Sequence, residues 1–133
     1  MNYLLDTHTF IWSFRQDEKL SKQVYKILED SRNTIFLSSI SLWEIAIKHQ
    51  LKKLDLGDLN ILHLSNIAKE YNFTIINPTA YDYITVSSLP LKENHRDPFD
   101  RMLIHTAIRN NYILLSKDKY FFQYQEHGLQ LFW

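Results

Sequence analysis

Mainly apolar segments alternate with segments of helical periodicity along the whole chain. The apolar segments are residues 2–6, 33–38, 73–77, 112–116 and 129–133. Short, nearly continuous apolar runs are typical of strands that are covered on both faces. The segments with helical patterns are 7–15, 19–30, 39–54, 59–71, 79–88 and 98–110, and 118–124 is expected to form a loop or a helical turn. Strands that alternate with helices predict an α/β sandwich around a mostly parallel sheet.

Bulk composition limits the classes of protein that fit. A length of 133 residues predicts one domain. The chain has no cysteine, which excludes disulfides and thiolate metal sites and fits a cytoplasmic protein. Lys plus Arg equals Asp plus Glu at 15 each, so binding of nucleic acid would require a local basic patch. The N-terminus lacks the basic leader of a signal peptide, and no apolar run is long enough to span a bilayer.

Several common catalytic motifs are missing from the sequence. Only two glycines occur, Gly57 and Gly128, which excludes the glycine-rich loops that bind dinucleotides or nucleoside triphosphates. The sequence also contains no HExxH helix and no GxSxG segment. Candidate chemistry therefore depends on acidic residues whose positions are unusual.

Asp100 stands at the start of the apolar stripe of the predicted helix 98–110. The stripe comprises Leu103, Ile104, Ala107 and Ile108, and Asp100 lies one turn before it on the same face. A buried carboxylate without a partner is costly, so Asp100 either is paired or lies in a cleft. Asp97 precedes Pro98 and is predicted to be the N-cap, which leaves Asp100 where a capping box would place its acid. The capping role and a role in a site both remain open for Asp100.

Glu44 interrupts a second apolar stripe, in the predicted helix 39–54. Ile40, Ile47 and Leu51 share its face of the helix. This position predicts an inward-facing carboxylate. The alternative is that Lys48, four residues later, pairs with Glu44 on a partly exposed face.

Two further acids follow predicted strands. Asp6 ends the first strand, and Asp118 lies two residues beyond the segment 112–116. Ligand sites in parallel sheets lie beyond the carboxyl ends of strands, although Asp6 is also placed to cap the helix beginning at Thr7, and Asp118 to form a turn. Clustered carboxylates are typical of Mg²⁺ or Mn²⁺ sites, where one or two ions activate water for phosphodiester hydrolysis. The sequence therefore predicts a metal site where these acids converge.

Four segments contain the candidate acids and their neighbours: LLDTHTFIW (4–12), SSISLWEIAIK (38–48), HRDPFDRMLIHTA (95–107) and LLSKDKYF (114–121). Together they resemble the PIN-domain ribonucleases, and in particular the VapC-type toxins of type II toxin–antitoxin systems. They occur in the order of the family and extend over nearly the whole chain. The resemblance implies a single PIN-like domain over 1–133, a three-layer α/β/α fold, an acidic pocket for Mg²⁺ or Mn²⁺, and endonucleolytic cleavage of RNA.

The resemblance also implies roles for individual residues. The catalytic and metal-binding acids of the family match Asp6, Glu44, Asp100 and Asp118. Ser116 stands where the family has a serine or threonine, and Thr7 follows the first acid. We expect both residues to support the site. Asp97 is assigned a supporting or capping role, and a reversed assignment of Asp97 and Asp100 remains open.

Partners are implied in the same way. VapC-type toxins are held by a small antitoxin whose extended C-terminal segment lies in the groove, and they are typically homodimers. The predicted helix 7–15 carries Phe10, Ile11, Trp12 and Phe14, which indicates either an interface or a fully buried helix. The alternative function is a non-catalytic PIN-like module that binds RNA or protein.

Basic residues near the acids are candidates for contacts with RNA phosphates. They are Lys48, Arg96 and Arg101. Arg101 is alternatively placed to bridge the carboxylates, and Lys52 and Lys53 are expected to lie on a solvated face. His95 either stacks on a base or has no role, and no side chain is an evident general base.

Overall fold

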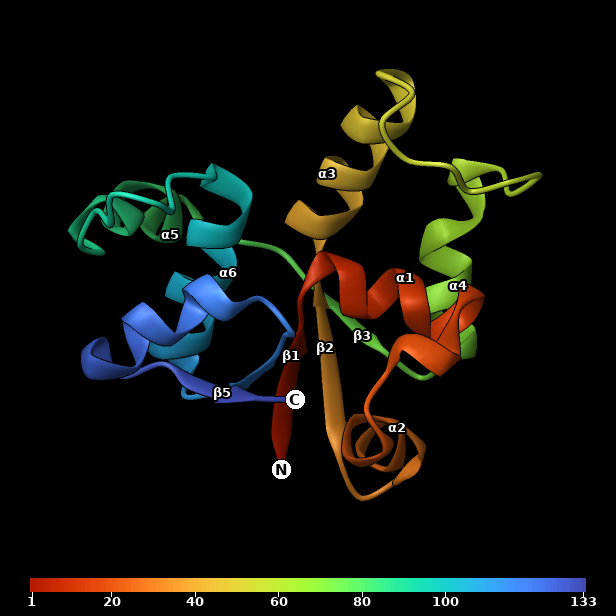
Figure 1. Ribbon diagram of the computed structural model, residues 1–133, viewed down its shortest axis with the longest axis horizontal. Coiled ribbons are helices and arrows are strands. Elements are labelled where there is room, and N and C mark those ends of the chain that lie inside the picture. The colour runs from red at the N-terminus through yellow and green to blue at the C-terminus, as the bar shows by residue number, and fades with distance from the viewer.

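The sheet is the centre of the molecule, and helices cover both of its faces (Figure 1). The computed structural model describes all 133 residues. The strands are β1 (Asn2–Leu5), β2 (Thr34–Ser38), β3 (Thr74–Ile76), β4 (Ile113–Leu115) and β5 (Gln130–Phe132). Their order across the sheet is β3-β2-β1-β4-β5, and every neighbouring pair is parallel. The predicted α/β class is confirmed, and the sheet is entirely rather than mostly parallel.

Six α-helices connect and flank the strands. They are α1 (Thr7–Arg15), α2 (Lys22–Glu29), α3 (Ser39–Gln50), α4 (Leu64–Glu70), α5 (Ala80–Thr85) and α6 (Pro98–Asn110). Short 3₁₀ helices span Asp17–Lys19, Ile61–His63 and Val86–Ser88, and a longer one, η4, spans Lys119–His127. None of the helices has the length and apolar character that a membrane crossing requires.

Two separate apolar cores define three layers. Alternate residues of a strand point to opposite faces, so Tyr3 and Leu5 belong to one core and Leu4 to the other. The first core packs α1, α2 and α4 against the sheet, and the second packs α6 and η4 against its other face. Figure 1 shows these two groups of helices on opposite sides of β1. The strands are covered on both faces, which explains their continuous apolar character.

The helix boundaries differ from prediction where local capping decides them. α1 and α6 span the predicted residues, because Asp6 and Asp97 cap them. α2 begins at Lys22 rather than at residue 19, since the Ser21 hydroxyl accepts from the amide of Val24. α3 ends at Gln50 rather than at residue 54, because Lys52 adopts a left-handed φ of 57°.

The remaining helical segments combine α and 3₁₀ geometry. The predicted helix 59–71 is a 3₁₀ turn followed by α4, and the predicted helix 79–88 is α5 followed by a 3₁₀ turn. The helical turn predicted for 118–124 is part of η4. In α1, Phe10 and Ile11 are buried, whereas Trp12 and Phe14 are only partly buried. The helix is thus neither fully buried nor an open apolar surface.

The connectivity of the sheet fixes where a ligand site is expected. The chain builds outward from β1 through β2 to β3, and then returns to place β4 and β5 on the other side of β1. The direction of winding therefore reverses between β1 and β4. Crevices form beyond the carboxyl ends of strands at such a reversal. Asp6 directly follows β1, and Asp118 follows β4.

Candidate active site

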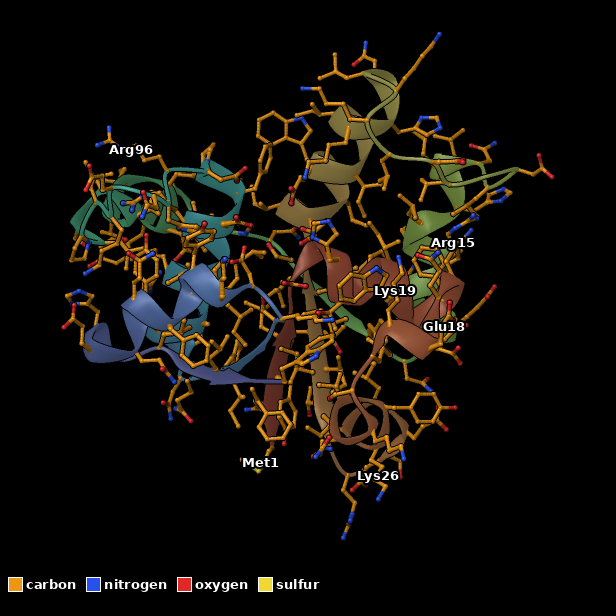
Figure 2. All side chains as sticks on the ribbon, in the orientation of Figure 1. Met1, Arg15, Glu18, Lys19, Lys26 and Arg96 are labelled. Atoms are coloured by element: carbon orange, nitrogen blue, oxygen red, sulfur yellow. The ribbon has the colours of Figure 1, made fainter.

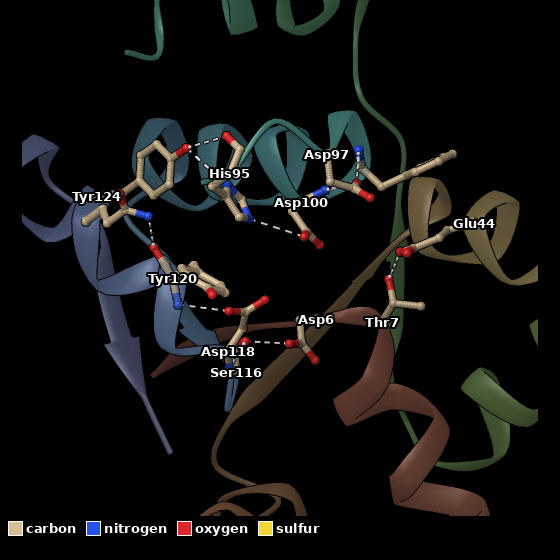
Figure 3. Close-up of polar contacts among 12 residues, drawn as sticks. Asp6, Thr7, Glu44, His95, Asp97, Asp100, Ser116, Asp118, Tyr120 and Tyr124 are labelled. Atoms are coloured by element: carbon tan, nitrogen blue, oxygen red, sulfur yellow. Dashed lines mark hydrogen bonds and ion pairs between the residues drawn. The ribbon is translucent and has the colours of Figure 1, made fainter. Parts of the chain in front are cut away.

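Asp6 and Asp118 lie at the same edge of the sheet and are joined by Ser116. The hydroxyl of Ser116 donates to Oδ2 of Asp6 and accepts from the amide of Asp118 at 3.1 Å (Figure 3). Ser116 is almost completely buried, so this connection is shielded from water. The strand ends therefore hold the two acids in a fixed relation, as their positions after β1 and β4 predict.

Helices α6 and α3 contribute the other two predicted acids. Asp100 lies in the first turn of α6, and its carboxylate points into the space that Asp6 and Asp118 also face (Figure 3). Glu44 lies in the middle of α3 and is 3% exposed. The hydroxyl of Thr7 donates to Oε1 of Glu44 at 2.6 Å. Elements that are far apart in the sequence thus bring all four carboxylates to one end of the sheet.

Electrostatics show how strongly these acids interact. Burial and the negative charge of neighbouring acids raise the pKa of the Asp100 carboxyl to about 8. The neighbours responsible are, in decreasing order of effect, Asp97, Glu44, Asp118 and Asp6. Burial also raises the pKa of Asp6, although hydrogen bonds from Ser116 and Thr9 partly oppose the shift. Like charges that repel in a buried space favour the binding of a cation or of protons.

The local capping roles coexist with this convergence. Asp6 is the N-cap of α1 and accepts from the amide of Thr9 at 2.7 Å. Asp118 caps η4 in the same way, and Asp97 caps α6. A carboxylate has two oxygens and several acceptor sites, so a cap leaves capacity for a ligand. The predicted capping role is therefore confirmed for Asp6 and Asp97, and Asp118 caps a 3₁₀ helix where a turn was predicted. These caps do not remove Asp6 or Asp118 from the site.

The sequence also offered a local role for each of the two acids on helices, Asp100 and Glu44. The capping-box role of Asp100 is wrong, because its side chain contacts Nε2 of His95 instead of returning to the N-cap. The predicted pairing of Glu44 with Lys48 is present at 2.7 Å, but Glu44 is buried rather than partly exposed. Burial alone would lower the pKa of Lys48, yet the contact with Glu44 raises it overall. Of the four predicted acids, Glu44 is the one that forms an ion pair with a lysine.

The basic residues near the site do not all face it. Arg101 is buried and donates to the main-chain oxygens of Leu89 and Pro90 at 2.7 and 3.1 Å. Its predicted contact with RNA, and the alternative of bridging the carboxylates, are therefore both wrong. Arg96 projects into solvent at the outer edge of the molecule (Figure 2). Lys52 and Lys53 are exposed, as expected for a solvated face.

His95 is the residue that the sequence analysis undervalued. It is 5% exposed, and its ring nitrogens lie 3.1 Å from the hydroxyl of Tyr124 and 3.2 Å from Oδ2 of Asp100. Burial lowers its pKa, which favours a neutral ring. Burial of the ring contradicts the prediction that His95 stacks on a base. The signal that could have found it is its place in HRDPFD, directly ahead of the two acids.

The donor set fits a hard divalent cation. Ligand atoms of His95, Asp100 and Asp118 all lie within 4.8 Å of one another. Asp6, Asp118 and Trp12 border an open hollow of about 370 Å³ that also contacts His8 and Lys117. Carboxylate oxygens beside a hollow open to water are the ligands that Mg²⁺ and Mn²⁺ favour. The acids therefore form a candidate cation site, and the hollow gives a substrate access to it at Asp6 and Asp118.

The chain thus has a parallel α/β/α fold with an acidic pocket at the reversal of the sheet, and comparison with known proteins identifies its family. The sequence model of the PIN domain matches residues 3–126, so the chain belongs to the PIN domain family. The resemblance found in the sequence is confirmed at this level.

Individual relatives agree with this assignment. The chain is 26% identical over 116 residues to Ribonuclease VapC22 of Mycobacterium tuberculosis. The matched region covers 87% of this chain and 86% of that protein. The structure of VapBC2 from Rickettsia felis bound to a promoter DNA fragment matches with a TM-score of 0.66 and 19% identity, over 99% of this chain and 98% of that one. DNA-bound VapBC from Salmonella typhimurium matches with a TM-score of 0.67 and 13% identity, over 99% and 97%. At these identities, the two structures establish likeness of fold.

Proposed function

We propose that this chain is a metal-dependent endoribonuclease and the toxin of a type II toxin–antitoxin pair. The observation that carries the proposal is the convergence of Asp6, Glu44, Asp100 and Asp118 at one end of a PIN-family sheet. Similarity to Ribonuclease VapC22 supports RNA as the substrate. The proposed reaction is hydrolysis of an internal phosphodiester bond.

The four acids have distinct tasks in this proposal. Asp6, Asp100 and Asp118 would hold Mg²⁺ or Mn²⁺, with Glu44 completing the acidic wall. Such a cation, when bound, polarises the phosphodiester and activates water for attack on phosphorus. Ser116 fixes the relative positions of Asp6 and Asp118, and Thr7 fixes Glu44.

Lys48 contributes positive charge at the same site. Its ammonium contacts Glu44 and lies close enough to Asp97 and Asp100 for their charges to affect its pKa. Its side chain is 37% exposed, so a phosphate of the RNA backbone can approach it. Lys48 would attract and orient the RNA, while Asp97 holds the first turn of α6 through its cap.

Protein partners belong to the same proposal. The similar structures from Rickettsia felis and Salmonella typhimurium are VapBC assemblies, which supports an antitoxin partner. Large apolar side chains remain exposed on α3 and α5, among them Trp43 at 58% and Ile84 at 72%. Such side chains support contacts with an antitoxin or a second copy of the chain. Light scattering of the purified chain alone measures whether it forms a dimer. The same measurement with its antitoxin shows whether the two proteins form a complex.

A titration of Mn²⁺ into the purified chain with structured RNA tests the proposal. Asp6→Asn is the informative variant, because asparagine caps a helix about as well as aspartate but lacks the charge. The exposed acid Asp58, changed to Asn, is the matched control. We expect metal-dependent cleavage by the wild type and by Asp58→Asn, and none by Asp6→Asn.

The other outcomes of the titration are equally informative. Binding of Mn²⁺ and RNA without cleavage would favour the non-catalytic binding module. Full cleavage by Asp6→Asn would contradict the assignment of Asp6. Cleavage that persists in excess chelator would contradict metal dependence.

A further inference from the structure

His95 is fixed beside the acidic pocket by its surroundings. It lies in the loop before α6, yet only 5% of its surface is exposed. Phe121 and Tyr124 of η4 contact its ring edge-on, with centroid distances of 5.2 and 5.5 Å. The imidazole therefore has one defined orientation, and Figure 3 shows Nε2 directed toward the carboxylates.

Tyr124 occupies the ring nitrogen of His95 that faces away from the acids. Its buried hydroxyl lies 3.1 Å from Nδ1 and 3.4 Å from the main-chain oxygen of His95. The hydroxyl can therefore accept from Nδ1–H while its own proton is directed to the main-chain oxygen. In that tautomer Nε2 presents its lone pair to the side of the ring where Asp100 lies.

The contact between His95 and Asp100 brings a nitrogen and an oxygen donor atom together. Nε2 lies 3.2 Å from Oδ2 of Asp100. When Nδ1 carries the proton, both atoms have free lone pairs, and a cation beside them can bind both. Metal-binding histidines typically have the same arrangement, with the other ring N–H donated to a fixed acceptor.

The third donor at this point comes from Asp118. Its ligand atom and those of His95 and Asp100 lie within 4.8 Å of one another, slightly more than twice a cation–ligand bond of roughly 2.1 Å. We infer that His95 is a nitrogen ligand of the cation, in addition to the proposed carboxylate ligands, so that the pocket is a mixed nitrogen–oxygen site. This inference rests on the proposed function in one respect, since both require a divalent cation in the pocket.

A nitrogen ligand changes which cation the pocket prefers. Mg²⁺ favours oxygen ligands, whereas transition-metal ions accept imidazole more readily. The pocket should therefore bind Mn²⁺ more tightly than Mg²⁺. His95→Gln should weaken Mn²⁺ binding by about tenfold or more and should weaken Mg²⁺ binding less. The difference between the affinities for the two ions should therefore become smaller.

Pulsed electron paramagnetic resonance of the full chain with one equivalent of Mn²⁺ tests the inference directly. A bound imidazole gives a nitrogen hyperfine coupling that a chain with only oxygen ligands lacks. Labelling histidine with ¹⁵N should replace the ¹⁴N pattern without any change in the sequence. The coupling should be lost in His95→Gln and retained in His105→Gln, because His105 is equally buried but contacts Thr85 instead of the acids.

Each result decides the inference independently of the RNA assay. Bound Mn²⁺ without a histidine coupling would overturn it, as would a coupling that persists in His95→Gln. Failure to bind Mn²⁺ at all would also overturn it. RNA cleavage without the coupling would leave the proposed function intact, and the coupling without cleavage would support the ligand while contradicting the nuclease.

Discussion

The two ends of helix α6 differ in how the negative charge of a buried or half-buried acid is compensated. At its C-terminal end, Asp82 pairs with Arg109, and its second oxygen accepts from the amide and hydroxyl of Thr79. At its N-terminal end, Asp100 contacts His95, whose pKa is lowered, and faces further carboxylates. The paired acid stabilises the fold, whereas the acid among like charges is poised to bind a ligand. The comparison teaches that burial alone does not indicate function, because the partners of the charge distinguish the two cases.

The largest expected effect is at the uncompensated end. Asp100→Asn keeps the shape of the side chain and removes its charge. We expect the rate of RNA cleavage to fall by more than about 100-fold. This loss exceeds the effect that usually follows mutation of a residue that only hydrogen-bonds to a metal ligand. The rate of cleavage at saturating Mn²⁺ measures it. Unchanged cleavage would show that the contrast between the two ends has no functional meaning.

At the C-terminal end of α6, where Arg109 compensates Asp82, mutation should lower stability and leave cleavage unchanged. Asp82→Asn removes the charge that Arg109 pairs with and weakens the capping box of α5. We expect the free energy of unfolding to fall by about 2 kcal/mol, in line with the loss of a hydrogen bond to a charged group. Urea unfolding measures the loss, and cleavage per folded molecule should stay close to that of the wild type. A selective loss of cleavage would place Asp82 in the site as well.

The pH dependence of stability gives a smaller effect. The pKa of Asp100 is raised from 3.8 to about 8, so the folded chain keeps a proton that the unfolded chain releases. In the metal-free protein, the contribution of Asp100 to the free energy of unfolding should therefore be greatest below about pH 4. This contribution should decline as the pH rises to about 8. We expect a decline of at least about 1 kcal/mol, since one pKa unit corresponds to 1.36 kcal/mol.

Unfolding curves measured from pH 5 to pH 8 check this sign. The decline should be shallower in Asp100→Asn, which has no proton to lose, and Mn²⁺ should oppose it in the wild type. Equal pH dependence in the two proteins would show that Asp100 is not the group responsible.

The smallest effect is expected at Asp97, beside Asp100 but exposed to solvent. Its carboxylate accepts from the amides of Phe99 and Asp100, and asparagine caps a helix about equally well. Asp97→Asn should leave stability unchanged and alter cleavage by no more than about threefold. A loss as large as that of Asp100→Asn would support the reversed assignment of the two acids.

Much of the fold was accessible from periodicity and capping. Continuous apolar runs indicated the buried strands, and Asp6 and Asp97 marked the starts of α1 and α6. The end of α3 was not accessible, because the left-handed conformation of Lys52 depends on the turn that follows. Propensity describes local preference, and long-range packing decides where a helix ends.

The candidate site was only partly accessible for a related reason. A carboxylate that interrupts an apolar stripe is visible in the sequence, so Glu44 and Asp100 were found. Arg101 follows Asp100 directly, but its guanidinium binds the carbonyls of Leu89 and Pro90 in a loop that folds back over α6. Nothing in the local pattern shows where that loop returns.

The sequence by itself determined the α/β class, the family and the acids that form the candidate pocket, because hydrophobic period and motif order are properties of the linear chain. Only the tertiary structure decided which buried charges are compensated. It paired Asp82 with Arg109, placed Lys48 beside Glu44, and set Nε2 of His95 against Asp100 through Tyr124. His95 and Tyr124 are 29 residues apart, and their contact exists because η4 packs against α6. Electrostatic interactions depend on distance and burial in space, which the order of residues does not contain.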